Sequence, residues 1–191
     1  MSIATNDTII AATQTWLERA VIGLNLCPFA KAVHVKKQIR YVVSRATTHE
    51  ELLSEFLNEL EFLAETPSEK IDTTLLIHPF VLTDFLDYND FLDVVDEALE
   101  DMDLEGELQV ASFHPQYQFA DAQPDDIENF TNRSPYPMLH LLRESSVAIA
   151  VSAFPEADKI FDKNIETLRK LGHKGWDALG LAKDHSAAEK K

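Results

Sequence analysis

The only cysteine of the chain, Cys27, lies in the segment NLCPFAK, residues 25–31. A cysteine attacks a substrate as a thiolate, and a position at the start of a helix, near a cation, lowers the thiol pKa. Cys27 holds that position if Pro28 begins a helical turn, with Lys31 on the next turn. If Cys27 instead ends the preceding helix, or is buried as a small apolar residue, its thiol is inert. Both interpretations fit the sequence, and Cys27 is a candidate nucleophile.

Two histidines stand at the ends of predicted strands and could act as acids or bases. His78 and His114 each precede a proline, in LLIHPF and VASFHPQYQF. Ligands of open α/β sheets bind beyond the carboxyl ends of the strands, so these histidines lie side by side there if their strands are parallel neighbours. Gln116 and Tyr117 follow His114 and are candidate substrate-binding residues. The alternative is that both imidazoles are neutral and bond to the backbone.

The segment TNRSPYPMLHLLRE, residues 131–144, contains a candidate anion site. Asn132, Arg133 and Ser134 precede a helix that we expect to begin at Pro137, because proline is favoured at the first helical position. The free N–H groups of a helix start bind anions, and an arginine beside them can bind a carboxylate or phosphate. The alternative is a turn capped by Ser134, with the arginines paired to acidic residues.

Further candidates lie on the helix expected after Pro137. His140 and Arg143 share its polar side, opposite the apolar residues. Arg143 and Lys31 would add positive charge to the anion site. A nucleophilic Cys27 needs a histidine within hydrogen-bond reach, and His114 or His140 would serve.

We predict neither a metal nor a cofactor. A mixed zinc site could be built from Cys27, His78, His114 and His140, but no two of them have the close spacing typical of zinc ligands. With five glycines in the chain there is no glycine-rich phosphate loop, which argues against the usual nucleotide cofactors.

Composition narrows the class of protein. The 191 residues fit one domain, with 45% hydrophobic and 26% charged residues, as in ordinary globular proteins. A net charge of −16 argues against general affinity for nucleic acid or for an anionic membrane. No apolar stretch approaches the ~20 residues that cross a bilayer, and the first residues do not resemble a secretory signal. We expect a cytoplasmic protein, and the sequence does not determine its oligomeric state.

The charges are unevenly distributed along the chain. Residues 71–132 contain no Lys or Arg but sixteen Asp or Glu, whereas residues 19–49 contain six Lys or Arg and no acid. Such asymmetry either creates a local positive field on an acidic body, or the two segments neutralise each other in the fold. Within the acidic segment, aspartates recur at every third position; they fit a solvated helical face better than a cation site, because that row drifts around a helix. They are Asp84, Asp87, Asp90, Asp93 and Asp96.

Hydrophobic periodicity predicts alternating helices and strands. We expect helices over about 7–26, 47–67, 82–103, 137–145 and 156–172, and strands over 38–46, 72–80, 107–115 and 146–155. This order predicts a single layered α/β domain, residues 1–175, with a four-stranded mixed or mostly parallel sheet flanked by about five helices. A ferredoxin-like α+β arrangement, with the sheet covered mainly on one face, is the alternative. Residues 176–191 are expected to form a loosely held tail.

Three segments together, GLNLCPFAK, SFHPQYQFA and TNRSPYPMLHLLRE, resemble an uncharacterised family of bacterial proteins known as domain of unknown function 1415. The resemblance extends from Trp16 to about Trp176. It implies a small cytoplasmic bacterial protein and supplies no established activity or catalytic residue.

Two functions follow from these residues. The first is an enzyme, a hydrolase or transferase, that acts on a small anionic metabolite, with Cys27, His114 and His140 as catalytic candidates. The second is a non-catalytic module whose acidic helix, residues 82–103, binds a basic protein partner. If the side chains of Cys27, His114, Arg133 and His140 converge on one cleft, the first is favoured.

Overall fold

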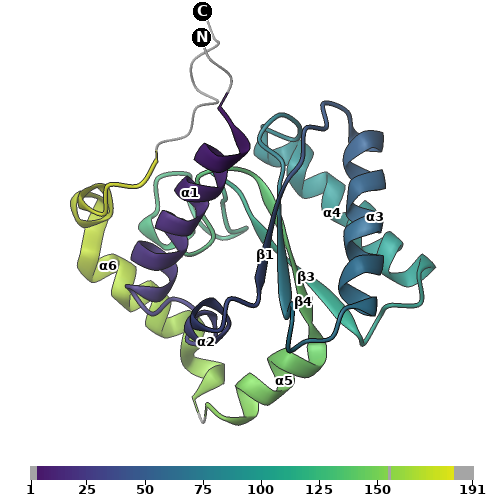
Figure 1. Ribbon diagram of the computed structural model, residues 1–191. Coiled ribbons are helices and arrows are strands. Elements are labelled where there is room, and N and C mark those ends of the chain that lie inside the picture. The colour runs from purple at the N-terminus through teal and green to yellow at the C-terminus, as the bar shows by residue number, and fades with distance from the viewer. Residues whose placement is uncertain (1–3, 155, 183–191) are drawn as a thin grey trace, which may run out of the picture.

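The computed structural model describes residues 4–154 and 156–182, and its strands form one mixed sheet (Figure 1). The strands are β1 (Ile39–Val43), β2 (Thr73–Ile77), β3 (Leu108–Phe113) and β4 (Met138–Arg143). They are ordered β1-β2-β4-β3, with β1 parallel to β2 and with β4 antiparallel to both β2 and β3. The predicted four-stranded mixed α/β architecture is confirmed.

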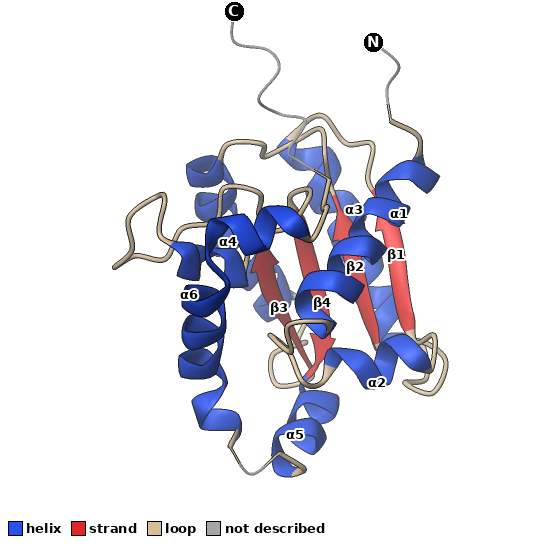
Figure 2. Cartoon of the chain, turned by 90° about the vertical axis from the view of Figure 1, so that its left-hand side faces the viewer, coloured by secondary structure: helices blue, strands red, loops and turns tan. Residues whose placement is uncertain are grey.

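Helices cover both faces of this sheet. They are α1 (Asn6–Trp16), which continues as a π-helical turn (Leu17–Ile22), α2 (Ala30–Val35), α3 (His49–Glu65), α4 (Phe85–Asp101), α5 (Glu144–Ser152) and α6 (Ile160–Ala178). In Figure 1 the sheet is seen nearly edge-on, with α1, α2 and α6 on one side and α3 and α4 on the other. Figure 2 views the α1 and α6 side. Because both faces are covered, the ferredoxin-like alternative is not what the chain forms.

Each face of the sheet has its own hydrophobic core. Leu139 and Leu141 of β4 pack with α3 and α4, whereas Met138 packs with α1. The alternation follows from strand geometry, in which successive side chains point to opposite faces. A central strand therefore needs apolar residues at nearly every position.

Local sequence explains where the long helices begin. Thr48 and Glu51 form a capping box at α3, each side chain bonding the other residue's backbone N–H. The Asp84 side chain accepts hydrogen bonds from two backbone N–H groups at the start of α4. Helices α3 and α4 and strands β1, β2 and β3 lie within their predicted ranges. No helix of the described residues is both long and apolar enough to cross a membrane.

For two neighbouring segments the prediction was wrong, because the segment expected as a helix is a strand and the segment expected as a strand is a helix. Residues 137–145, expected as a helix, contain β4, and residues 146–155, expected as a strand, contain most of α5. The run MLHLLR reads equally well as a helix stripe or as a strand buried on both faces, and it is the central position in the sheet that makes it a strand. Helix α5 is apolar but buries none of its residues. The anion site expected at a helix start after Ser134 therefore lacks its helix.

The last helix continues beyond its predicted end. At Gly172 the backbone (φ 64°, ψ 174°) is not helical, which produces a kink where we expected α6 to stop. Beyond the kink, the Trp176 ring packs edge-on against Phe130, with centroids 5.0 Å apart. Arg19 donates a hydrogen bond to the carbonyl of Leu179. Residues 176–182 thus pack on the body, and residues 183–191 of the expected tail lie outside the described part.

Candidate functional site

A cavity of about 240 Å³ lies where the end of α1 meets the end of α6, and we call it the Arg133 cavity. Its polar lining residues are Arg133, Ser134 and Asp177, and its aromatic lining residues are Trp16, Phe130 and Trp176. The two tryptophans are the only ones in the chain. Arg133 and Ser134 were predicted from the sequence, whereas the aromatic residues were not, because helical periodicity marked Trp16 only as part of a buried face.

The guanidinium of Arg133 is held in one orientation. Its Nε donates to the carbonyl of Tyr117 at 3.1 Å and its Nη2 to that of Pro124 at 2.6 Å. Its Cζ lies 4.4 Å from the centroid of the Phe130 ring, a cation–π distance. Nη1 makes no hydrogen bond to any described residue. Burial lowers the pKa of Arg133 from its ordinary value, although an arginine stays charged in proteins.

No carboxylate of the described residues forms a direct ion pair with this guanidinium. None of the ion pairs among the described residues includes Arg133, although the chain contains 33 Asp and Glu. The field of Asp125 partly offsets the effect of burial on the pKa of Arg133, and Asp177 lines the same cavity. A half-buried cation without a partner is costly unless something supplies negative charge or polar contacts.

The residues beside Arg133 hold the loop in place. Trp16 donates its indole N–H to the carbonyl of Arg133 at 2.9 Å. The hydroxyl of Ser134 donates to the carbonyl of Tyr136 at 2.7 Å, and the amide of Asn132 donates to the carbonyl of Ser112 at 3.1 Å. Ser134 thus forms a turn, as the alternative interpretation expected, while Arg133 is not paired with an acid.

His114 lies next to the cavity in sequence but its ring does not line it. The ring is fully buried, its Nδ1 accepts the N–H of Gln116 at 3.0 Å, and its Nε2 therefore carries the proton donated to the carbonyl of Leu82 at 3.2 Å. The Gln116 residue is exposed. Tyr117 packs against Phe85 with ring centroids 5.2 Å apart and bonds to Arg133 through its carbonyl.

His78 and His114 are not on neighbouring strands, because β4 separates β2 from β3. The ring of Tyr88 nevertheless links them, with centroids 5.8 Å from His78 and 5.1 Å from His114. His78 bonds the carbonyl of Val81 through Nδ1, and its buried Nε2 has no hydrogen-bond partner among the described residues. Burial lowers the pKa of His78 to about 4, so the ring is neutral at pH 7.

His140 lies in the middle of β4, on the face covered by α1. Its Nε2 lies 2.7 Å from the hydroxyl of Thr73. That hydroxyl donates to the carbonyl of Leu141 at 2.6 Å, so it accepts the imidazole N–H. Burial lowers the pKa of His140 to about 4. The ring is a neutral structural group and does not line the Arg133 cavity.

Arg143 is buried, with 9% of its surface exposed, and serves the end of α3. Its Nη2 donates to the carbonyls of Leu63, Thr66 and Ile71. The last carbonyls of a helix lack partners within the helix and carry partial negative charge, which a cation satisfies. Arg143 therefore lies away from the Arg133 cavity and bonds to the backbone through Nη2, whereas its buried Nε has no hydrogen-bond partner among the described residues.

Cys27 lies three residues before α2, whose N-cap residue is Phe29, so it does not hold the cap position that one interpretation expected. The backbone N–H groups of Phe29 and Ala30 lower its pKa, but burial raises it more, and the net pKa lies above the ordinary value. The side chain packs at the edge of the α1-side core. Lys31 is exposed, one turn further on.

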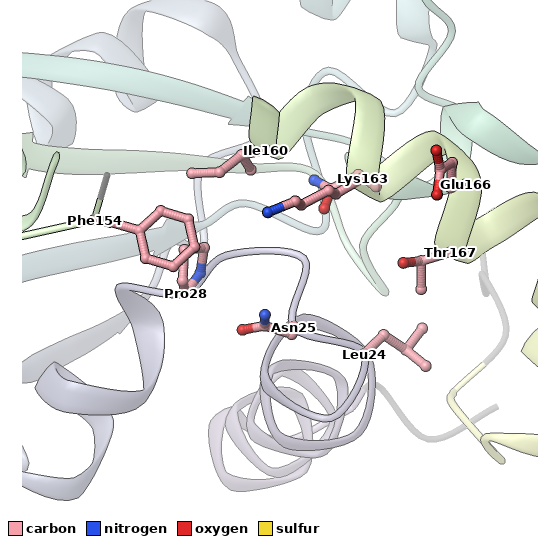
Figure 3. Close-up of a pocket in the computed structure, with 9 residues that line it drawn as sticks. Leu24, Asn25, Pro28, Phe154, Ile160, Lys163, Glu166 and Thr167 are labelled. Carbon is pink, nitrogen blue, oxygen red and sulfur yellow. The ribbon is translucent and has the colours of Figure 1, made fainter. Parts of the chain in front are cut away.

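A second cavity, of about 220 Å³, lies between the turn that precedes Cys27 and the first half of α6. Figure 3 shows Asn25 and Leu24 on one side of it and Lys163 and Thr167 on the other. Cys27 is not among its lining residues. Across residues 4–154 and 156–182, no three His, Cys, Asp or Glu side chains are grouped so as to hold a metal ion.

The predicted site residues therefore divide into separate places. Arg133 and Ser134 share a cavity, whereas Cys27, His114 and His140 lie outside it. Fold and site define a mixed α/β protein with an aromatic cavity that contains an unpaired arginine. The chain belongs to the family described as protein of unknown function (DUF1415), whose model matches residues 8–178. Neither a curated protein nor a solved structure matches it.

Proposed function

We propose that the protein binds a small anionic molecule in the Arg133 cavity. The observation that carries this proposal is a half-buried guanidinium that no carboxylate of an acidic protein pairs with. Two carbonyls and the Phe130 ring hold the guanidinium, while the N–H groups of Nη1 remain able to donate to a ligand. A donor that is already oriented loses little entropy on binding, which favours affinity.

The proposal is one of binding rather than catalysis. A hydrolase or transferase step through Cys27, His114 or His140 finds no support, because none of these residues lines the cavity. The thiol pKa of Cys27 is raised, which disfavours the thiolate that a nucleophile requires. We also infer a cytoplasmic location, since a lone free thiol suits a reducing compartment.

Tryptophan fluorescence tests the proposal, because both tryptophans of the chain line the cavity. We expect small carboxylates, or phosphate, to change the emission in a saturable way. The variant Arg133→Gln should lose this response by at least about tenfold in affinity. Its matched control is Arg169→Gln, since Arg169 is exposed and pairs with Glu128 outside the cavity. Equal binding by Arg133→Gln and the unaltered protein would refute the proposal.

The acidic face of α4 supports a second candidate function, the binding of a basic protein segment. Its aspartates and glutamates are exposed and join no ion pair among the described residues. None of the ion pairs in the described part links residues 19–49 to residues 71–132, so the basic segment does not neutralise this face through direct pairs. Leu86, 71% exposed, adds an apolar contact at the start of the helix.

This second candidate is tested with a synthetic basic amphipathic peptide. Binding should weaken steeply with salt, as expected for exposed charges. The double change Asp90→Lys and Asp93→Lys should abolish binding, whereas Glu50→Lys and Glu61→Lys on α3 make the same charge change on another helix and should only weaken it. Equal loss in both double variants would show that net charge, rather than α4, attracts the peptide.

A further inference from the structure

Aromatic and apolar side chains form a large part of the lining of the Arg133 cavity, beside the polar residues Arg133, Ser134 and Asp177. Trp16, Phe130 and Trp176 line it together with Pro135 and Leu181. A bare inorganic anion would use only the arginine and leave these walls facing water. Ligand cavities with apolar walls and a few placed polar groups bind molecules that bury an apolar part and orient it by the polar contact.

The aromatic rings are held in fixed positions. Phe130 lies under the Arg133 guanidinium and contacts the edge of Trp176 at an interplanar angle of 74°. Trp16 is held by its bond to the Arg133 carbonyl and by an edge contact to Phe113, with centroids 5.3 Å apart. A flat ring entering the cavity would meet such rings edge-on or offset, which aromatic pairs prefer.

The charge of the cavity limits the ligand to one anionic group. Arg133 is the only Lys or Arg among the described residues that line it, and the carboxylate of Asp177 lines it as well, which further disfavours a second negative group on the ligand. Two of its nitrogens already bond to carbonyls, so the donors that remain on Nη1 suffice for one carboxylate. A second carboxylate, or a doubly charged phosphate, would enter aromatic surroundings without a partner cation, which is costly.

The volume limits the ligand to a small molecule. Drug-sized ligands occupy cavities of roughly 300–1,000 Å³. The Arg133 cavity, at about 240 Å³, is smaller and suits a single ring that carries a short acid group. Building on the proposed function, we infer that the cavity binds a monocarboxylate attached to one small flat ring, of the size of benzoate or phenylacetate.

Calorimetric titration with matched probes tests this inference, with tryptophan emission excited at long wavelength as a second readout. Benzoate supplies ring and charge, acetate the charge alone, benzamide the ring without charge, and cyclohexanecarboxylate a ring that is not flat. Phosphate and phthalate carry additional charge. We expect benzoate to bind about tenfold or more tightly than each of the other probes.

A variant pair locates the ring preference. Trp176→Leu should reduce the ratio of benzoate to acetate affinity by about fivefold. Phe161→Leu, which removes an exposed ring of α6 outside the cavity, should leave the ratio unchanged. The ratio is measured within each variant, so a change in stability does not alter its meaning. Circular dichroism confirms folding.

The outcomes separate this inference from the proposed function. If acetate or phosphate binds as tightly as benzoate and depends on Arg133, the proposed anion binding stands and the ring inference is wrong. If benzoate binds equally well to Arg133→Gln, both are wrong. If none of the probes binds at millimolar concentration, both are likewise rejected.

Discussion

The interior of the sheet and the Arg133 cavity both contain polar side chains that bond to backbone carbonyls, but they differ in what remains available. In the interior, Arg143 donates from Nη2 to three carbonyls, and its Nε is buried where no ligand can reach it. In the cavity, Arg133 bonds to two carbonyls and keeps Nη1. The comparison shows that an arginine with only carbonyl partners is structural where it is buried and available where it borders a cavity.

The largest loss of stability is expected when Arg143 is replaced. Replacing it as Arg143→Met should lower the free energy of unfolding by about 4 kcal/mol, because three carbonyls near the end of α3 lose their donor. Urea denaturation measures the change. Arg169→Met, which removes an exposed ion pair, should cost at most about 0.5 kcal/mol. If Arg143→Met lowers the free energy of unfolding only slightly, the fold does not depend on the interior arginine, and its contrast with Arg133 is wrong.

A similarly large loss of stability is expected when the pH is lowered. The pKa of His78 is about 4 in the folded protein and 6.5 in the unfolded chain, so between these values the unfolded state binds the proton first. The contribution of His78 to stability is complete above pH 6.5 and falls by about 3 kcal/mol as the pH drops to 4. The difference in unfolding free energy between the unaltered protein and His78→Gln should narrow accordingly.

The control for acidification is His49→Gln, because His49 is exposed. Its unfolding free energy should follow that of the unaltered protein across the same pH range. If the difference between the unaltered protein and His78→Gln stays constant from pH 6.5 to 4, the interior histidine is not held neutral by burial.

A smaller loss of stability is expected from Arg133. The change Arg133→Gln should cost about 1–2 kcal/mol, because only two neutral carbonyls lose a partner and the group is half-buried. Benzoate should raise the melting temperature of the unaltered protein and leave that of Arg133→Gln unchanged. Thermal denaturation with and without benzoate measures both. A loss as large as that of Arg143→Met would mean that Arg133 is structural as well.

The smallest change in stability is expected when Cys27 is replaced. Because burial raises its pKa, labelling with a disulfide reagent should be slower than for an unfolded control and should increase only above the ordinary thiol pKa of about 8.5. The change Cys27→Ala should cost about 1 kcal/mol and leave benzoate binding unaltered, since Cys27 lies outside the Arg133 cavity. Rapid labelling at pH 7 would contradict a raised pKa and would make Cys27 a candidate nucleophile again.

Sequence alone determined the elements whose signals are local. Hydrophobic periodicity predicted α3 and α4, and both helices begin at capping residues that the sequence contains, Thr48 with Glu51 for α3 and Asp84 for α4. The acidic positions of α4 were predicted to face solvent, and they are exposed. Helix caps and amphipathic periodicity depend on residues a few positions apart, and the sequence contains all of that information.

Tertiary structure decided the remainder. The apolar run at Met138 became a strand because it fills the centre of a sheet, and that location depends on β2 and β3. The sequence predicts the same role for Arg133 and Arg143, as positive groups of one anion site. The fold places Arg133 at a cavity and Arg143 at the end of α3. Which donors of an arginine are free depends on carbonyls and rings from distant segments, and no local pattern encodes those contacts.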